Sequence, residues 1–120
     1  MNGNLPPDPE AFVHSWIDAF NRRDWPAYGA CFAEDVTYLT PGRAVPLVSR
    51  QAHLEQDQRK AGSGRLEARL IVAGQDGRHI VVEGLFSDGQ RHSRWVTVLE
   101  MRDGVIAAER LYFDRATTQS

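Results

Sequence analysis

Apolar side chains in the first half of the chain recur with the spacing of helices. Between residues 9 and 20 they fall at positions i, i+1, i+4, i+5 and i+8, which predicts an amphipathic helix of about three turns. Asp8 followed by Pro9 has the form of an N-cap and a first helical position. The elements expected next are a helix over residues 25–33, a strand over residues 36–39 and a helix over residues 49–60.

From Arg65 onward the apolar positions alternate with a period of two, as in strands. The expected strands cover residues 66–72, 79–86, 92–101 and 105–113. The segments between them each hold Gly next to or near Asp, which is the chemistry of hairpin turns. Helices followed by an antiparallel meander predict an α+β domain in which a curved sheet wraps around helices.

The composition indicates one soluble globular domain. The chain has 120 residues, of which 42% are hydrophobic and 25% charged, and its mean hydropathy is -0.44. We expect a flexible N-terminal arm over residues 1–7, a single domain over residues 8–115 and a C-terminal tail over residues 116–120.

Charge and cysteine content exclude several classes of protein. The 14 basic and 16 acidic side chains are scattered, which disfavours nucleic acid as a partner. The single cysteine, Cys31, cannot form an internal disulfide, and we expect it to be a buried small hydrophobe. No apolar run approaches the roughly 18 residues of a membrane span, and the N-terminus lacks the pattern of a signal peptide. We therefore expect a cytoplasmic protein with no membrane partner.

Three segments together resemble a known family: Trp16 to Asp24, Phe32 to Tyr38, and Arg102 to Asp114. They are similar to the SnoaL-like polyketide cyclases of the nuclear-transport-factor-2-like, ketosteroid-isomerase-like superfamily. The resemblance implies a cone-shaped α+β barrel, in which a strongly curved, mostly antiparallel sheet wraps around three N-terminal helices. It also implies an apolar pocket for a hydrophobic small-molecule substrate, a homodimer paired through the outer face of the sheet, and chemistry without a metal or organic cofactor.

The resemblance itself excludes one mechanism of the superfamily. Ketosteroid isomerases carry an oxyanion-stabilising Tyr on the first helix and a base Asp before the Pro-Gly that ends the first strand. Trp16 and Thr40 stand at those positions here. An indole is not acidic and a Thr hydroxyl is a negligible base near neutral pH, so the steroid isomerase mechanism is set aside.

Asp114 is the first candidate catalytic residue. SnoaL-like cyclases place an acid/base Asp at the end of the last strand in a Tyr-Phe-Asp context, and Tyr112 to Asp114 match it. Uninterrupted alternation puts Arg110, Tyr112 and Asp114 on one strand face; if that face lines the cone, Asp114 stands near its mouth. An apolar setting would raise the pKa of its carboxyl, and Arg110 or Tyr112 could counter enolate charge. The alternative is a solvated carboxylate that merely ends the strand.

His53 and Asp57 form the second candidate group. They are four residues apart, on one face of the third expected helix, so Asp57 could orient His53 for proton transfer. In the similar family the position of His53 is more often aliphatic and turned inward. The alternative is a surface pair on a very polar helix.

The expected pocket lining is aromatic, and no metal site is indicated. Side chains expected to contact substrate are Trp16, Phe20, Tyr38, Trp95 and Tyr112, with Met101 lining the same cone. The remaining histidines, His14, His79 and His92, do not have the spacing of metal ligands on a single element.

Two classes of function stay open from the sequence. The leading hypothesis is a small cofactor-independent enzyme of the cyclase, isomerase or lyase type, with Asp114 as general acid/base on an apolar oxygenated metabolite such as a polyketide. An epoxide hydrolase is the alternative within this class, with Arg110, Asp57 and Asp114 as its candidate residues. The rival is a non-catalytic ligand-binding or dimerisation domain.

Overall fold

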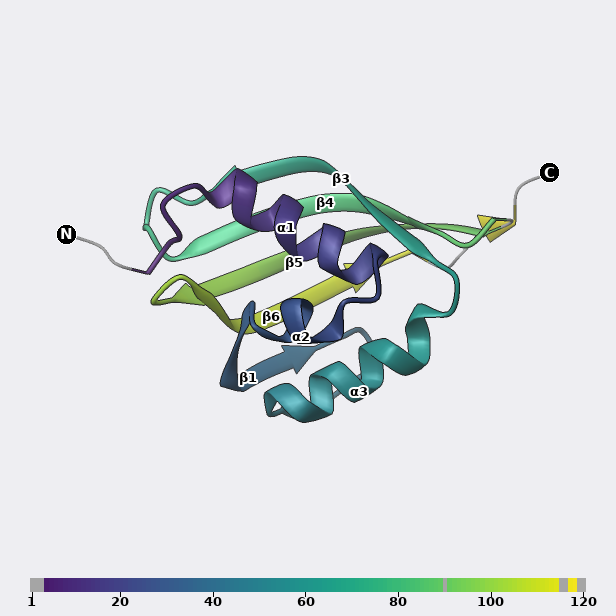
Figure 1. Ribbon diagram of the computed structural model, residues 1–120, viewed down its shortest axis with the longest axis horizontal. Helices are drawn as coiled ribbons and strands as arrows, with labels where there is room; N and C mark the ends of the chain where they lie inside the picture. Colours follow the sequence, from purple (N-terminus) through teal and green to yellow (C-terminus); the bar gives the residue numbers. More distant parts are fainter. Residues whose placement is uncertain (1–3, 90, 115–116, 119–120) are drawn as a thin grey trace.

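The computed structural model describes residues 4–89, 91–114 and 117–118. Three helices, α1 (Pro9–Asn21), α2 (Trp25–Gly29) and α3 (Arg50–Ala61), precede most of the sheet (Figure 1). The strands are β1 (Phe32–Leu39), β2 (Leu47–Val48), β3 (Arg65–Ala73), β4 (His79–Ser87), β5 (Arg91–Arg102), β6 (Val105–Phe113) and β7 (Thr117–Thr118).

Each helix begins at a side chain that caps its first backbone amides. Asp8, Asp24 and Ser49 accept hydrogen bonds from the amide three residues later, at 3.1, 3.1 and 3.2 Å. The caps of α1 and α3 confirm the predicted starts. The second helix, however, is shorter than expected, because β1 already begins at Phe32 and pairs there with Ile106 of β6.

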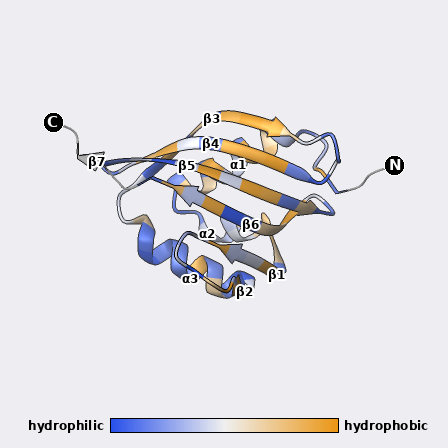
Figure 2. Ribbon diagram, turned by 180° about the vertical axis from the view of Figure 1, so that it is seen from behind, coloured by the Kyte–Doolittle hydropathy of each residue, from blue (hydrophilic) through white to orange (hydrophobic). Residues whose placement is uncertain are grey.

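The strands form one sheet in the order β2-β1-β6-β5-β4-β3, with β7 paired to β5. Only the β1–β6 pair is parallel among the described strands; the other pairs are antiparallel. The helices lie on one face of this curved sheet, as the views from the two sides show (Figures 1 and 2). The α+β fold class with a curved, mostly antiparallel sheet is thus confirmed. In the described part of the chain, no helix has the length and apolar character needed to cross a membrane.

Both flanking segments contact the domain where the structure describes them. The carbonyl of Asn4 accepts a hydrogen bond from the Gly104 amide at 2.9 Å, and Pro6 is buried. At the other end, Thr117 and Thr118 pair with the start of β5. These contacts involve residues of the expected arm and tail. They are made by backbone groups, which can pair without apolar side chains, so the apolar pattern of the sequence does not reveal them.

The core fills the space between the helices and the sheet. Its largest completely buried side chains include Phe32, Ile80, Leu99, Met101 and Ile106. The helix α1 packs on β3, and α3 packs on β1 at the other edge of the sheet. Because the two helices cover opposite edges, the middle of the sheet remains available for a cavity.

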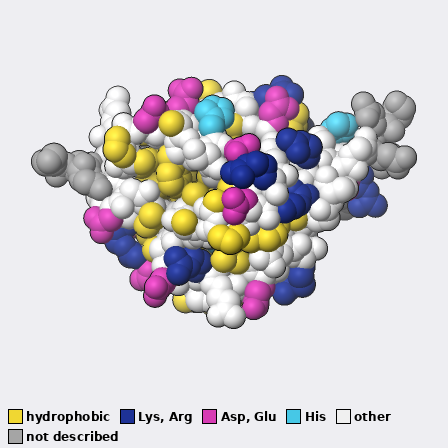
Figure 3. Space-filling model, viewed as in Figure 1, with side chains coloured by type: hydrophobic (Ala, Val, Ile, Leu, Met, Phe, Trp, Pro, Cys, Tyr) yellow, Lys and Arg dark blue, Asp and Glu magenta, His cyan; other side chains and the backbone are white. Residues whose placement is uncertain are grey.

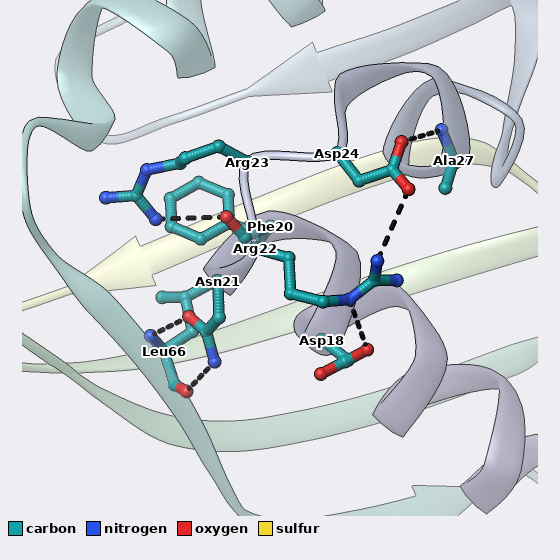
Figure 4. A network of polar contacts seen from close by, with 8 residues as sticks. All are labelled: Asp18, Phe20, Asn21, Arg22, Arg23, Asp24, Ala27 and Leu66. Carbon is teal, nitrogen blue, oxygen red and sulfur yellow. Dashed lines mark hydrogen bonds and ion pairs between the residues drawn. The ribbon is translucent and has the colours of Figure 1, made fainter.

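Arg23 joins the end of α1 to the segment that follows α3 (Figure 4). Its guanidinium donates hydrogen bonds to the carbonyls of Phe20 at 3.0 Å and of Gly62 and Gly64 at 2.7 Å each. Asn21, next to it, accepts a hydrogen bond from the Leu66 amide at 2.8 Å and donates one to the Leu66 carbonyl at 2.9 Å. Arg23 therefore fixes the segment that follows α3, and Asn21 fixes the start of β3.

We expect Arg23→Met to lower the free energy of unfolding by about 2 kcal/mol, because several carbonyls lose a charged donor. Arg22→Met is the matched control. Arg22 makes exposed ion pairs with Asp18 and Asp24, which solvent screens, so its loss should change the free energy of unfolding much less. Urea unfolding followed by tryptophan fluorescence measures both; equal losses would contradict the role given to Arg23.

Candidate active site

A cavity of about 500 Å³ lies between the helices and the sheet. This volume suits one small organic molecule. Its wall is mostly aromatic and aliphatic, with a few acidic and hydroxyl-bearing side chains. The residues that line it are Trp16, Phe20, Tyr28, Tyr38, Asp57, Lys60, Ala61, Leu66, Phe86, Ser93, Trp95, Glu109, Leu111, Phe113 and Asp114.

A β-bulge in β6 decides which face of that strand meets the cavity. In the pairing with β5, Met101 lies opposite Ile106 and Glu100 opposite Ala108, which leaves Ala107 as the extra residue. Ile106 is buried before the bulge, and Glu109 is buried after it. The face of β6 beyond the bulge that meets the cavity carries Glu109, Leu111 and Phe113.

Because of the bulge, the face of β6 that the sequence hypothesis placed toward the cone is not the face that lines the cavity. Uninterrupted alternation put Arg110 and Tyr112 toward the cone, but neither lines the cavity. Tyr112 is instead about half exposed, at 52%, on the outer side of the sheet. The extra residue shifts the alternation by one, which a period-two pattern cannot reveal.

His53 lies behind the cavity wall, between two carboxylates. Its Nε2 is 2.9 Å from Oε1 of Glu109, and its Nδ1 is 3.0 Å from Oδ2 of Asp57. The first contact has hydrogen-bond geometry. The second is close but misaligned, so it is mainly electrostatic. Since His53 is 1% exposed, the alternative of a surface pair on α3 does not apply.

Two hydroxyl groups complete the array of side chains around His53. Tyr28 on α2 donates a hydrogen bond of 2.6 Å to Oδ2 of Asp57, and Thr97 on β5 donates one of 2.9 Å to Oε2 of Glu109. We call Tyr28, Asp57, His53, Glu109 and Thr97 the acid–base array. Its members come from α2, α3, β5 and β6, so the tertiary fold assembles it.

Burial and charge act in opposite directions on the pKa of His53. Burial lowers it, but the close negative charges of Asp57 and Glu109, together with the hydrogen bond to Glu109, outweigh burial and raise it to about 10. The imidazole ring therefore carries a positive charge at neutral pH. Tyr38 stacks on it, with ring centres 3.9 Å apart and an interplanar angle of 9°. This contact excludes water from one face of the ring.

The array leaves two polar groups available to a ligand. Oδ1 of Asp57 and the hydroxyl of Tyr38 make no hydrogen bond within the described part of the chain, and both side chains line the cavity. Burial, first, and the nearby charges of Glu109 and Asp57 raise the pKa of the Tyr38 hydroxyl well above its usual value of about 10. Tyr38 thus stays protonated at neutral pH and can donate a hydrogen bond, and Oδ1 of Asp57 is open as an acceptor.

Further unpaired donors surround the same cavity. The indole nitrogens of Trp16 and Trp95 are enclosed and have no hydrogen-bond partner among the described residues. The Trp95 ring lies directly against Gly84 of β4, where a Cβ atom would come within 2.4 Å of its Cζ2 atom. Buried polar atoms are usually paired, so this concentration of exceptions around one cavity is typical of a functional site.

Asp114 lies at the mouth of the cavity, where β6 ends. Its Oδ2 accepts a hydrogen bond of 2.9 Å from Nε of Arg94, and its side chain is 54% exposed. The position near the mouth agrees with the sequence hypothesis. The dry, apolar surroundings that the hypothesis gave to this carboxylate are found instead around Asp57 and Glu109, whose side chains are 11% and 5% exposed.

Four of the side chains expected to contact substrate, those of Trp16, Phe20, Tyr38 and Trp95, line this cavity. Met101, expected in the same lining, is buried in the core away from it. Sequence reasoning missed Glu109, Tyr28 and Thr97 as polar members of the array. Cys31 is half-buried, and burial raises the pKa of its thiol to about 11. No described group of three or more His, Cys, Asp or Glu side chains could hold a metal ion.

The curved sheet, the three helices on one face and the cavity between them define an NTF2-like domain. Residues 13–109 match the family model of the SnoaL-like domain. The chain belongs to this family. A comparison with curated proteins gives no significant match.

Solved structures with the same fold include proteins of several described activities. A Kribbella flavida DSM 17836 protein provisionally described as a ketosteroid isomerase is 24% identical over 92% of this chain and 80% of its own, with a TM-score of 0.79. SalBIII, described as an epoxide hydrolase/cyclase-like enzyme of pyran ring formation in salinomycin, is 20% identical over 92% and 95%, with a TM-score of 0.79. An LEH-like epoxide hydrolase of M. tuberculosis is 21% identical over 87% and 80%, with a TM-score of 0.70. At these identities the likeness shows the fold.

The raised pKa of His53 predicts a pH-dependent stability. The folded pKa of about 10 lies above the ordinary 6.5, so the stabilisation is complete below pH 6.5 and is lost as pH rises toward 10. Urea unfolding of the wild type between pH 6 and 9 should show a fall of a few kcal/mol.

His53→Gln should remove most of that slope, because Gln does not titrate. His79→Gln alters a histidine at the start of β4, on the surface, and serves as the control that keeps the slope. An unchanged slope in His53→Gln would show that other groups cause the pH dependence.

Proposed function

We propose that the protein is an acid–base enzyme of the isomerase or cyclase type, with Asp57 as the general base, acting on an apolar oxygenated small molecule. The observation that carries this proposal is the unequal use of the two array carboxylates. Both oxygens of Glu109 accept hydrogen bonds, from His53 and Thr97, whereas only Oδ2 of Asp57 is engaged. Oδ1 of Asp57 is therefore the carboxylate oxygen of the array left to take a proton from a substrate.

The surroundings of Asp57 prepare it for this role. Tyr28 and His53 hold one oxygen in place, which fixes the direction of the other toward the cavity. The side chain is largely removed from water, so little solvent must leave before proton transfer. Asp114 lacks the second feature: Arg94 holds its Oδ2, but its side chain is 54% exposed to solvent. This contrast moves the proposed role from Asp114 to Asp57.

Tyr38 supplies the complementary electrophile. Asp57 Oδ1 takes a proton from a carbon next to a substrate carbonyl, and the electron pair of that C–H bond forms a carbon–carbon double bond. The carbonyl oxygen becomes an enolate, which accepts a hydrogen bond from the Tyr38 hydroxyl. Return of the proton from Asp57 to another carbon gives an isomer. Attack of the enolate carbon on a second carbonyl of the same molecule gives a ring, whose new alkoxide takes the proton.

The described activities of the similar structures support this class of chemistry. Their descriptions name ketosteroid isomerase, cyclase-like and epoxide hydrolase activities for those proteins. Each of these reactions moves a proton at or near an oxygenated carbon of a small molecule. A cavity that combines an aromatic wall with one free carboxylate oxygen and one free hydroxyl suits the same chemistry here.

Deuterium exchange tests the proposal without knowledge of the natural substrate. 2-Tetralone is a flat, neutral ketone with acidic protons next to its carbonyl. In D2O the wild-type protein should speed deuterium incorporation at those carbons above the buffer rate, as followed by NMR. Asp57→Asn should lose the acceleration by at least about 100-fold, and Tyr38→Phe by about 10-fold or more.

Two variants control this experiment. Glu55→Gln changes an exposed carboxylate two residues from Asp57 on α3 and should exchange like the wild type. Asp114→Asn should lose far less activity than Asp57→Asn. Loss confined to Asp114→Asn would return the base to Asp114. Absence of any acceleration by the wild type would favour a non-catalytic binding domain instead.

Epoxide hydrolysis is the second candidate, because the same pair of groups serves it. Asp57 would take a proton from water while Tyr38 donates one to the epoxide oxygen as the ring opens. The likeness to an LEH-like epoxide hydrolase and to SalBIII favours testing it.

A single turnover of styrene oxide with excess protein in ¹⁸O-labelled water distinguishes the routes. Direct attack by water predicts label in the first diol formed, with loss of diol formation in Asp57→Asn. Unlabelled diol in that first turnover would instead show attack by Asp57 itself. No diol above the buffer rate would exclude epoxide hydrolysis of this substrate.

A further inference from the structure

The cavity runs lengthwise from the acid–base array to the mouth. Glu109 and Asp114 are five residues apart in sequence, which is roughly 16 Å along a strand. The side chains of Leu111 and Phe113 face the cavity between them. On the opposite wall, Asp57 and Lys60 are separated by about one helical turn of α3. A ligand that extends from the array to the mouth therefore passes along an apolar wall.

The two ends of the cavity differ in charge. The inner end holds the carboxylates of Asp57 and Glu109 around one imidazolium, which leaves one net negative charge. At the mouth, Arg94 offsets Asp114 by a direct ion pair. Lys60 also lines the mouth but takes part in no ion pair with the described residues. The mouth therefore carries one net positive charge, opposite in sign to the inner end.

The surrounding surface adds to this difference. Arg23 adds a positive charge beside the C-terminal end of α3, where its guanidinium binds the carbonyls of Gly62 and Gly64. Lys and Arg side chains lie on this side of the helix-bearing face, interspersed with Asp and Glu side chains (Figure 3). A positive field at a cavity mouth favours anionic ligands and raises their rate of association.

We propose that the substrate carries a carboxylate at the end of its apolar body, and that Lys60 binds this carboxylate at the mouth. The inference rests on the proposed function for which end reacts: the neutral, oxygenated end enters first and meets Asp57 and Tyr38. The negative inner end repels the carboxylate, and the positive mouth attracts it, so charge alone sets the direction of binding.

The charge at the mouth also selects among anions. One unpaired ammonium balances a monoanion, whereas the nearby carboxylate of Asp114 opposes a second negative charge. A carboxylate fits this arrangement better than a phosphate monoester, which carries close to two charges at neutral pH. Lys60 is accordingly a specificity-determining residue that takes no part in proton transfer.

A matched pair of probes tests the proposal: 6-phenylhexanoate and its neutral amide, 6-phenylhexanamide. Isothermal titration calorimetry at pH 7 and low salt should show the acid binding to the wild type about three- to tenfold more tightly than the amide. Lys60→Met should bring this ratio close to one, and Lys60→Glu should reverse it. Asp114→Asn should raise the ratio, and added salt should lower it in the wild type.

Arg59→Met is the matched control. Arg59 precedes Lys60, is exposed, and does not line the cavity, so its loss should leave the ratio largely intact. An equal ratio in the wild type, a preference that survives Lys60→Met, or failure of both probes to bind would each overturn the proposal. The measurement needs no turnover. A carboxylate preference together with normal deuterium exchange in Asp57→Asn would reject the proposed chemistry and keep the substrate class.

Discussion

The structure depends on one positively charged ring held between two negatively charged side chains, away from water. Burying any of these charges alone would be unfavourable by several kcal/mol, and their mutual attraction offsets that cost only when all are present. His53 therefore requires Asp57 and Glu109, and each carboxylate requires His53. Because the residues come from α3 and β6, this requirement draws the helix and the sheet together at a defined distance.

The aromatic residues around His53 serve the same arrangement. Phe32 and Tyr38, both on β1, contact the ring at centroid distances of 4.6 and 3.9 Å. Their contact keeps water away and thereby strengthens every charge interaction within the array. Arg23 then fixes the far end of α3, so Asp57 and Lys60 keep their places relative to β6. Packing and the proposed proton transfer thus depend on the same contacts at this end of the molecule.

Local patterns in the sequence predicted those parts of the fold and site that depend on neighbours along the chain. The caps at Asp8 and Ser49 and the four-residue spacing of His53 and Asp57 are such features. Glu109 could not be found in this way, since the bulge that turns it inward is visible only in the pairing of β5 and β6. One local signal was present: Glu109 is a carboxylate on the same period-two strand face as the apolar residues Leu111 and Phe113.

The bulge at Ala107 has a consequence for how such a domain can change. Without the extra residue, Ile106 and Glu109 would be two positions apart and would share one face of the strand by simple alternation. Deletion of the Ala107 codon would therefore straighten β6 and keep Glu109, Leu111 and Phe113 in the cavity wall. The bulge is thus a point where the strand can change length by one residue without exchanging the groups that face the interior. Variation in length among domains of this shape can accumulate here while the chemistry of the cavity is preserved.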